Sequence, residues 1–304
     1  MSSELFEQHI SWLARNYNCV NITGLLEQQA SGIILPRTAC VTFDDGFMNN
    51  YTVALPILKK YRVPATLFVA AGYVGGDDLI WSDRLAAIIA TKSGATALTF
   101  GDESYSVRTS DDCAKSFRSI AAALKKLHPN EIEVGIIRFA SSNNIDISML
   151  NNASWFDEFR IADWQQLREM VCSEIFEVGS HTINHTIVSR LSREEAKQEI
   201  VGSLEILKAN IDAVPYFAYP NGGSSDFSSE HRDIAKDANY RAVTTAIPGS
   251  FTKYSDPFQI YRIGVGANMS VSELDYTLRI GAAFTTETSL SQFASGIISG
   301  TMNH

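Results

Sequence analysis

Apolar and polar positions along the chain follow two alternating patterns. Short apolar runs, too short for helices, predict strands at residues 39–43, 65–70, 174–180, 216–220, 241–246 and 261–265. Longer stretches, in which apolar residues recur every three or four positions, predict helices at 5–15, 49–61, 81–92, 111–127, 130–140, 163–170, 196–211, 229–238 and 271–282. This alternation predicts an α/β fold with a mainly parallel sheet covered by helices.

Local signals refine some of these elements. Pro56 predicts a bend within its helix, and Ser192 with Glu195 predicts a capping box at the start of the longest helix. Two short segments, LTF (98–100) and YSV (105–107), flank a Gly-Asp-Glu sequence and predict a β-hairpin. Residues 285–304 are rich in Ser, Thr and Gly, and we expect them to be loosely held.

Composition narrows the classes of function. The chain has 304 residues, is 45% hydrophobic and carries a net charge of -9, so it can bury a sizeable core but offers no basic stripe to a nucleic acid. Its four cysteines lack the spacing of a disulfide framework or a zinc ribbon, which indicates a reducing compartment. No secretion signal and no apolar stretch of about 18 residues is found, so we expect a cytoplasmic protein without a membrane span.

The first polar cluster that suggests chemistry is TFDDG, residues 42–46, directly after a predicted strand. Adjacent carboxylates such as Asp44 and Asp45 repel each other, and strands disfavour Asp. A bound cation would relieve that repulsion. Alone, the motif is most simply a turn.

The second cluster is HTINH, which follows the strand predicted at 174–180. His181 and His185 are four positions apart, so a helical turn would place both on one face at the spacing of a metal site. Two histidines and one aspartate suit zinc or a similar divalent transition metal and leave coordination positions open for catalysis. Alone, such a pair is more often a feature of a surface helix.

The third cluster is YPNGG, residues 219–223, which follows the YFA that begins the strand predicted at 216–220. Gly222 and Gly223 let the backbone approach a ligand, and the backbone N–H of Asn221 could stabilise an oxyanion. Alone this is an ordinary loop. Because the carboxyl ends of barrel strands meet at one face, the three clusters together predict one shared metal site.

These three motifs, in this order, resemble the polysaccharide deacetylase family, also called carbohydrate esterase family 4 or the NodB homology domain, and in particular its exopolysaccharide-associated subgroup. The resemblance covers about residues 36–75 and 160–265. It implies an irregular (β/α) barrel and a hydrolase that removes N-acetyl groups from amino sugars of a poly- or oligosaccharide or its lipid-linked precursor.

The resemblance also assigns roles to residues. It implies that Asp45, His181 and His185 bind a divalent metal, Zn²⁺ first and Co²⁺, Ni²⁺ or Mn²⁺ as alternatives. Asp44 would be the base that activates a metal-bound water, and the backbone of Asn221 would hold the oxyanion. The implied substrate-binding residues are Tyr219, Pro220 and Trp164, although Trp164 at a helix start could equally belong to the core.

The chain departs from the family pattern in three places. Many members carry an arginine that orients the base near the position of Ala218, and a late histidine as general acid near 261–265. Here His231 is the nearest substitute for that acid. The chain also starts at a helix where the subgroup has a strand, so we expect a barrel that lacks its first strand and is either open or completed by a partner chain.

We interpret residues 1–304 as a single catalytic domain with an insertion at about 76–158, which forms either a rim that selects substrate or a packing or oligomer contact. We expect the protein to bind an N-acetylated glycan, and we expect neither nucleic-acid binding nor a membrane span. The sequence does not decide whether it forms a homo-oligomer.

Two alternatives to N-deacetylation remain. One is another amide hydrolase on this fold, such as a deformylase or an amidohydrolase, and the other is a non-catalytic glycan-binding protein.

Overall fold

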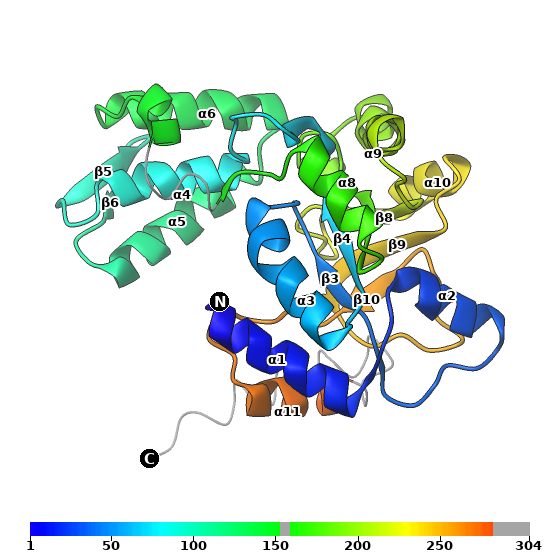
Figure 1. Cartoon of the computed structure of the whole chain (residues 1–304). Coiled ribbons are helices and arrows are strands. Elements are labelled where there is room, and N and C mark those ends of the chain that lie inside the picture. Colours follow the sequence, from blue (N-terminus) through cyan, green and yellow to red (C-terminus); the bar gives the residue numbers. More distant parts are fainter. Residues whose placement is uncertain (153–158, 282–304) are drawn as a thin grey trace, which may run out of the picture.

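A parallel sheet of six strands forms the centre of the molecule (Figure 1). The computed structural model describes residues 1–152 and 159–281. The strands follow the order β10-β9-β8-β7-β4-β3. Their bounds are β3 Val41–Phe43, β4 Ala65–Val69, β7 Phe176–Ser180, β8 Tyr216–Ala218, β9 Ala242–Pro248 and β10 Ile260–Arg262. Every neighbouring pair is parallel, which confirms the predicted α/β class.

Helices lie around this sheet and extend to one side of it (Figure 1). Their bounds are α1 Ser3–Asn16, α2 Ile22–Ala30, α3 Leu55–Tyr61, α4 Trp81–Thr91, α5 Ser110–Leu124, α6 Pro129–Ser142, α8 Trp164–Cys172, α9 Arg193–Asn210, α10 Ser229–Asp237 and α11 Val271–Gly281. The predicted capping box is confirmed, because Ser192 Oγ accepts from the Glu195 N–H while the Glu195 carboxylate accepts from the Ser192 N–H. None of the helices described is both long and apolar enough to cross a membrane.

Two helices differ from the expected elements. The helix expected at 49–61 is divided into a short π-helix, η1 (Asn50–Ala54), and α3, and Pro56 lies in the first turn of α3, where its missing N–H is tolerated. Helix α2 was not expected from the sequence. Its Ile22 and Leu26 are buried against Phe68 and Tyr216, so packing against the sheet stabilises a helix whose own pattern is short.

The sheet curls until its two edge strands approach each other. Arg262 at the end of β10 donates to Asp44, just beyond β3, at 2.7 Å, and its guanidinium lies 3.4 Å from Thr42 Oγ1 within β3. The strand order nevertheless has β3 and β10 as edges, so the described strands form an irregular barrel that is open between them. A separate short pair, β1 (Asn18–Cys19) with β2 (Thr38–Ala39), lies outside this sheet.

The helices and the hairpin within residues 81–152, between β4 and α8, form a helical lobe beside the sheet (Figure 1). It contains α4, α5, α6, the 3₁₀ segment η3 (Ile147–Asn152) and the hairpin β5 (Ala97–Phe100) with β6 (Glu103–Ser106). The hairpin confirms the prediction. Leu85, Ile120 and Ile136 of this lobe belong to the same buried cluster as the strands, so the lobe packs on the main core. The predicted loose tail, 285–304, lies outside the described residues.

Candidate metal centre and active site

The DDG motif forms a tight turn at the end of β3. Asp45 has φ 71° and Gly46 has φ 94°, both in the left-handed region. The Gly46 N–H donates to Asp44 O at 2.9 Å, and the Ala70 N–H donates to Asp45 O at 3.1 Å, which ties the turn to the end of β4. Because the backbone turns here, the side chains of Asp44 and Asp45 take different directions and have different partners.

Asp45 meets the two histidines of HTINH. Its Oδ1 lies 3.1 Å from His185 Nε2 and 3.5 Å from His181 Nε2, and the three residues each offer a ligand atom within 4.8 Å of the others. Within the described chain, Asp45 Oδ1 is buried and makes no hydrogen bond. A buried carboxylate oxygen that faces two imidazole nitrogens fits a divalent cation.

The imidazole of His181 is held in one orientation by a backbone carbonyl. Its Nδ1 lies 2.7 Å from the carbonyl oxygen of Ala218, which can only accept, so Nδ1 carries the proton. That leaves Nε2 with its lone pair facing Asp45. Such a contact behind a ligand fixes both the ring orientation and its tautomer.

Burial and neighbouring charges act in opposite directions on the pKa values of Asp45 and His181. Burial raises the pKa of Asp45, but the neighbouring His185 and His181 outweigh burial and hold that pKa well below its usual range. For His181, burial lowers the pKa, while Asp45 and Asp44 raise it to a net value above normal. The Asp45 carboxylate therefore stays ionised at neutral pH, and a metal bound at His181 would displace a proton from that ring.

HTINH is a loop rather than the helical turn expected from its spacing. Thr182 and His185 both have positive φ, 64° and 52°, which bends the backbone so that the two rings converge. Glu199 of α9 holds this bend: its carboxylate accepts from the N–H groups of Ile183 and Asn184 at 2.8 and 2.9 Å. Sequence reasoning missed Glu199, although a carboxylate beside Ile200 on the buried stripe of an amphipathic helix was a usable signal.

Asp44 is held by an arginine that the sequence reading also missed. Arg262 Nη1 and Nη2 donate to the two oxygens of Asp44 at 2.7 and 2.8 Å, a bidentate pair. Its Nε donates to Thr245 O at 2.8 Å, which fixes the guanidinium plane. The expected place for such an arginine was near Ala218. The group comes instead from β10, which reaches Asp44 only because the sheet curls.

The third motif forms a turn with left-handed residues, Asn221 at φ 60° and Gly222 at φ 66°. A Cβ on Gly222 would lie 2.7 Å from the backbone nitrogen of Ala246, so only glycine fits. Tyr219 is buried and its ring stacks on Phe227 at 4.4 Å. Tyr219 therefore supports the turn from the core side, and the adjacent Pro220 is buried as well.

His231 and Trp164 lie outside the metal cluster. His231 belongs to the first turn of α10, where its Nδ1 accepts from the Ser228 N–H at 3.0 Å and the backbone of Val188 also hydrogen-bonds the ring. Burial lowers its pKa. These contacts give His231 a role in capping α10, and we propose no acid role for it. Trp164 is half-buried at the first position of α8, close to Gly75.

A further carboxyl group lies near the centre. Asp83 in the first turn of α4 has a buried Oδ2 without a hydrogen-bond partner in the described chain. Burial first, and the negative charge of Asp45 second, raise the pKa of Asp83 to about 7. The first turn of α4, where the lobe begins, is thus close enough to Asp45 for the charge of Asp45 to act on Asp83.

Comparisons with known proteins agree with this geometry. A family model described as polysaccharide deacetylase matches residues 35–243, more than half of the chain, and spans all three motifs. A poly-beta-1,6-N-acetyl-D-glucosamine N-deacetylase of Staphylococcus aureus (strain MSSA476) is 34% identical over 79 residues. That segment covers 26% of this chain and 27% of the relative, so the match spans about a quarter of the relative's length.

Solved structures share the fold. The Streptococcus pyogenes deacetylase PplD, in complex with acetate, aligns with a TM-score of 0.57 at 18% identity, covering 90% of this chain and 86% of that one. IcaB from Ammonifex degensii aligns with a TM-score of 0.55 at 19% identity, covering 91% and 89%. At these identities the likeness concerns the fold, and it agrees with the irregular (β/α) barrel.

Proposed function

Because the chain belongs to the polysaccharide deacetylase family, we propose that it is a metal-dependent hydrolase that removes N-acetyl groups from amino sugars. The substrate class is a poly- or oligosaccharide, or its lipid-linked precursor. The observation that carries the proposal is the convergence of Asp45, His181 and His185 beside an Asp44 held by Arg262. The name of the staphylococcal relative supports a polymer of N-acetylglucosamine.

Asp45, His181 and His185 are the proposed metal ligands. Their two imidazole nitrogens and one carboxylate oxygen suit Zn²⁺ first, with Co²⁺, Ni²⁺ or Mn²⁺ as alternatives. When bound, such a cation supplies Lewis-acid chemistry that acidifies water and polarises an amide carbonyl. The protein's task is to hold the acetamide and the attacking water in register with Asp44.

Asp44 is the proposed general base. It takes one proton from the water while the water oxygen forms a bond to the acetamide carbon. Arg262 occupies one lone pair on each Asp44 oxygen and fixes the plane of the carboxylate, leaving further lone pairs for the water. The two aspartates thus have different proposed roles, Asp45 as a metal ligand and Asp44 as the base, and Arg262 and the metal offset their mutual repulsion.

The backbone N–H of Asn221 is the proposed donor to the developing oxyanion. The left-handed turn at Asn221 and Gly222 supports this role, because it is a backbone shape that can aim N–H groups at a ligand. When the C–N bond breaks, the amine needs a proton. We propose that Asp44 returns the proton it took, which yields acetate and the free amine. Trp164 stays a proposed wall of the sugar groove.

The proposal is tested by acetate release from N-acetylglucosamine oligosaccharides by the zinc-loaded protein, beside Asp44→Asn. We expect release by wild type and at least a hundredfold loss in the variant, in the range of general-base catalysis. An N-formylated amide tested in parallel covers the other amide hydrolases. Binding of glycan without release of acetate, or release of formate alone, would overturn the proposal.

A further inference from the structure

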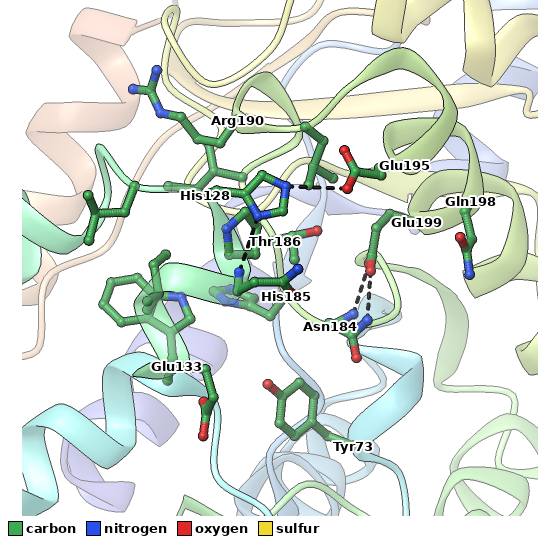
Figure 2. Close-up of a pocket in the computed structure, with 17 residues that line it drawn as sticks. Tyr73, His128, Glu133, Asn184, His185, Thr186, Arg190, Glu195, Gln198 and Glu199 are labelled. Carbon is green, nitrogen blue, oxygen red and sulfur yellow. Dashed lines mark hydrogen bonds and ion pairs between the residues drawn. The ribbon is translucent and has the colours of Figure 1, made fainter. Parts of the chain in front are cut away.

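A cavity of about 320 Å³ lies between the helical lobe and the HTINH loop (Figure 2). His185 and Asn184 border it on the loop side, and Glu195 and Gln198 border it from α9. Trp81, His128 and Glu133 line it from the lobe. The cavity is therefore built by two parts of the chain that are far apart in sequence, and it touches a proposed metal ligand.

The cavity wall combines aromatic surface with hydrogen-bonding groups. Trp81 and Tyr73 supply rings, while Asn130, Gln198 and Glu133 supply amide and carboxylate groups. In Figure 2, Tyr73 and Glu133 lie across the space from His128 and Glu195. Aromatic faces beside convergent polar groups bind ligands that have both C–H surface and hydroxyl groups, which is the character of a sugar ring.

The charges in the cavity disfavour an anion. Glu195 Oε1 lies 3.3 Å from His128 Nε2, Glu133 pairs with Arg84, and Glu199 is engaged by the HTINH backbone. The cation of the wall, Arg190, already donates through Nε to the carbonyl of Lys125 at 3.0 Å. The lining thus has three carboxylates, Glu133, Glu195 and Glu199, against one arginine, and this surplus of negative charge favours a neutral ligand over a phosphate or a uronate.

We propose that this cavity is a subsite for one neutral N-acetylhexosamine unit of the glycan, adjacent in the chain to the unit being deacetylated. The inference rests on the proposed function and deepens it. Its volume is at the lower end of small-molecule pockets, which suits one sugar ring rather than two. Because His185 borders the cavity and also faces Asp45, a ligand in the cavity lies beside the reaction centre. The helical lobe thereby selects for glycan length.

Two blocking variants test the subsite. Gln198→Trp and Asn130→Trp each place an indole at an exposed position of one wall, so the fold should tolerate them. Gln8→Trp is the matched control, because Gln8 is also an exposed helical glutamine but lies in α1. The zinc-loaded proteins are compared for kcat/KM on N-acetylglucosamine monosaccharide and on its pentasaccharide, and for pentasaccharide binding by calorimetry.

We expect both blocking variants to lose at least tenfold in kcat/KM and in affinity for the pentasaccharide, with the control unchanged. Turnover of the monosaccharide should stay within threefold of wild type in all three. If the enzyme releases acetate but the blocking variants match the control on the pentasaccharide, the subsite is wrong and the proposed function stands. If the wild type binds the pentasaccharide, the blocking variants do not, and no acetate is released, the subsite stands and the proposed function fails. Absence of both binding and release in wild type overturns both.

Discussion

Arg262 is the residue whose removal should separate metal binding from catalysis. It makes two charge-assisted hydrogen bonds to Asp44, and neither Arg262 nor Asp44 belongs to the metal cluster. Replacement by glutamine, Arg262→Gln, deletes the bidentate fork and keeps a polar side chain of moderate length. We expect the metal to stay bound while the base loses its fixed orientation.

The expected loss of kcat follows from the role of the Arg262–Asp44 pair. General-base catalysis contributes about 10²- to 10⁴-fold, and a freely rotating Asp44 keeps part of it. We therefore expect kcat to fall about 10²-fold, which corresponds to about 2.7 kcal/mol in the activation barrier. Stability should change less, by about 1 kcal/mol, because the side chain of Asp44 is 33% exposed and water can replace the guanidinium.

The assay is steady-state acetate release on the pentasaccharide, with metal content measured on the same sample. Arg279→Gln in α11 is the control, since Arg279 also pairs with an aspartate, Asp275, but on an exposed helix face. Arg262→Lys should fall between wild type and Arg262→Gln, because lysine keeps the charge but not the fork. A kcat for Arg262→Gln within threefold of wild type, with metal retained, would refute the orienting role.

Three other outcomes are expected. Asp44→Asn should keep one metal per chain and lose at least 10²-fold in kcat, so loss of the metal in this variant would contradict the separation of Asp44 from the ligands. Glu199→Gln should weaken metal affinity about 10- to 100-fold in a chelator competition, because the Glu199 carboxylate shapes the loop that carries His185. An unchanged affinity would rule out this supporting role of Glu199. In the folded, metal-free protein the pKa of Asp83 is about 7, against the usual 3.8, so the folded state binds its proton more tightly than the unfolded state. The free energy of unfolding should therefore fall as pH rises from 3.8 to about 7, by at most about 4 kcal/mol. Asp83→Asn should remove that slope in a urea titration series, and an identical slope in the variant would exclude Asp83 as its source.

The convergence of Asp45, His181 and His185 could be predicted from the sequence better than the contacts that support it. Residues at the carboxyl ends of parallel strands meet at one face, which is where these three side chains lie. The spacing of the histidines suggested a helical turn, whereas the structure has a bent loop. A spacing of four residues fits both shapes, and contacts with distant parts of the chain, such as those with Glu199 and Gly72, stabilise the loop.

Arg262 and α2 show what the sequence could not supply. Arg262 reaches Asp44 across 218 residues of chain, and its approach depends on how far the sheet curls, which no local pattern encodes. Helix α2 is short, and its helical shape depends on Ile22 and Leu26 packing against Phe68 and Tyr216. Both depend on tertiary contacts, so strand and helix periodicity alone could not place them.

The most direct test of the account is the metal content of the purified protein by elemental analysis, beside His185→Ala. His185 Nε2 lies 3.1 Å from Asp45 Oδ1, so its loss should open the centre without touching Asp44 or Arg262. The account predicts about one divalent transition-metal ion per chain in wild type and almost none in the variant, when both proteins are folded to the same extent. Wild-type protein that stays metal-free after incubation with excess Zn²⁺, or a variant that binds as tightly as wild type, would contradict it.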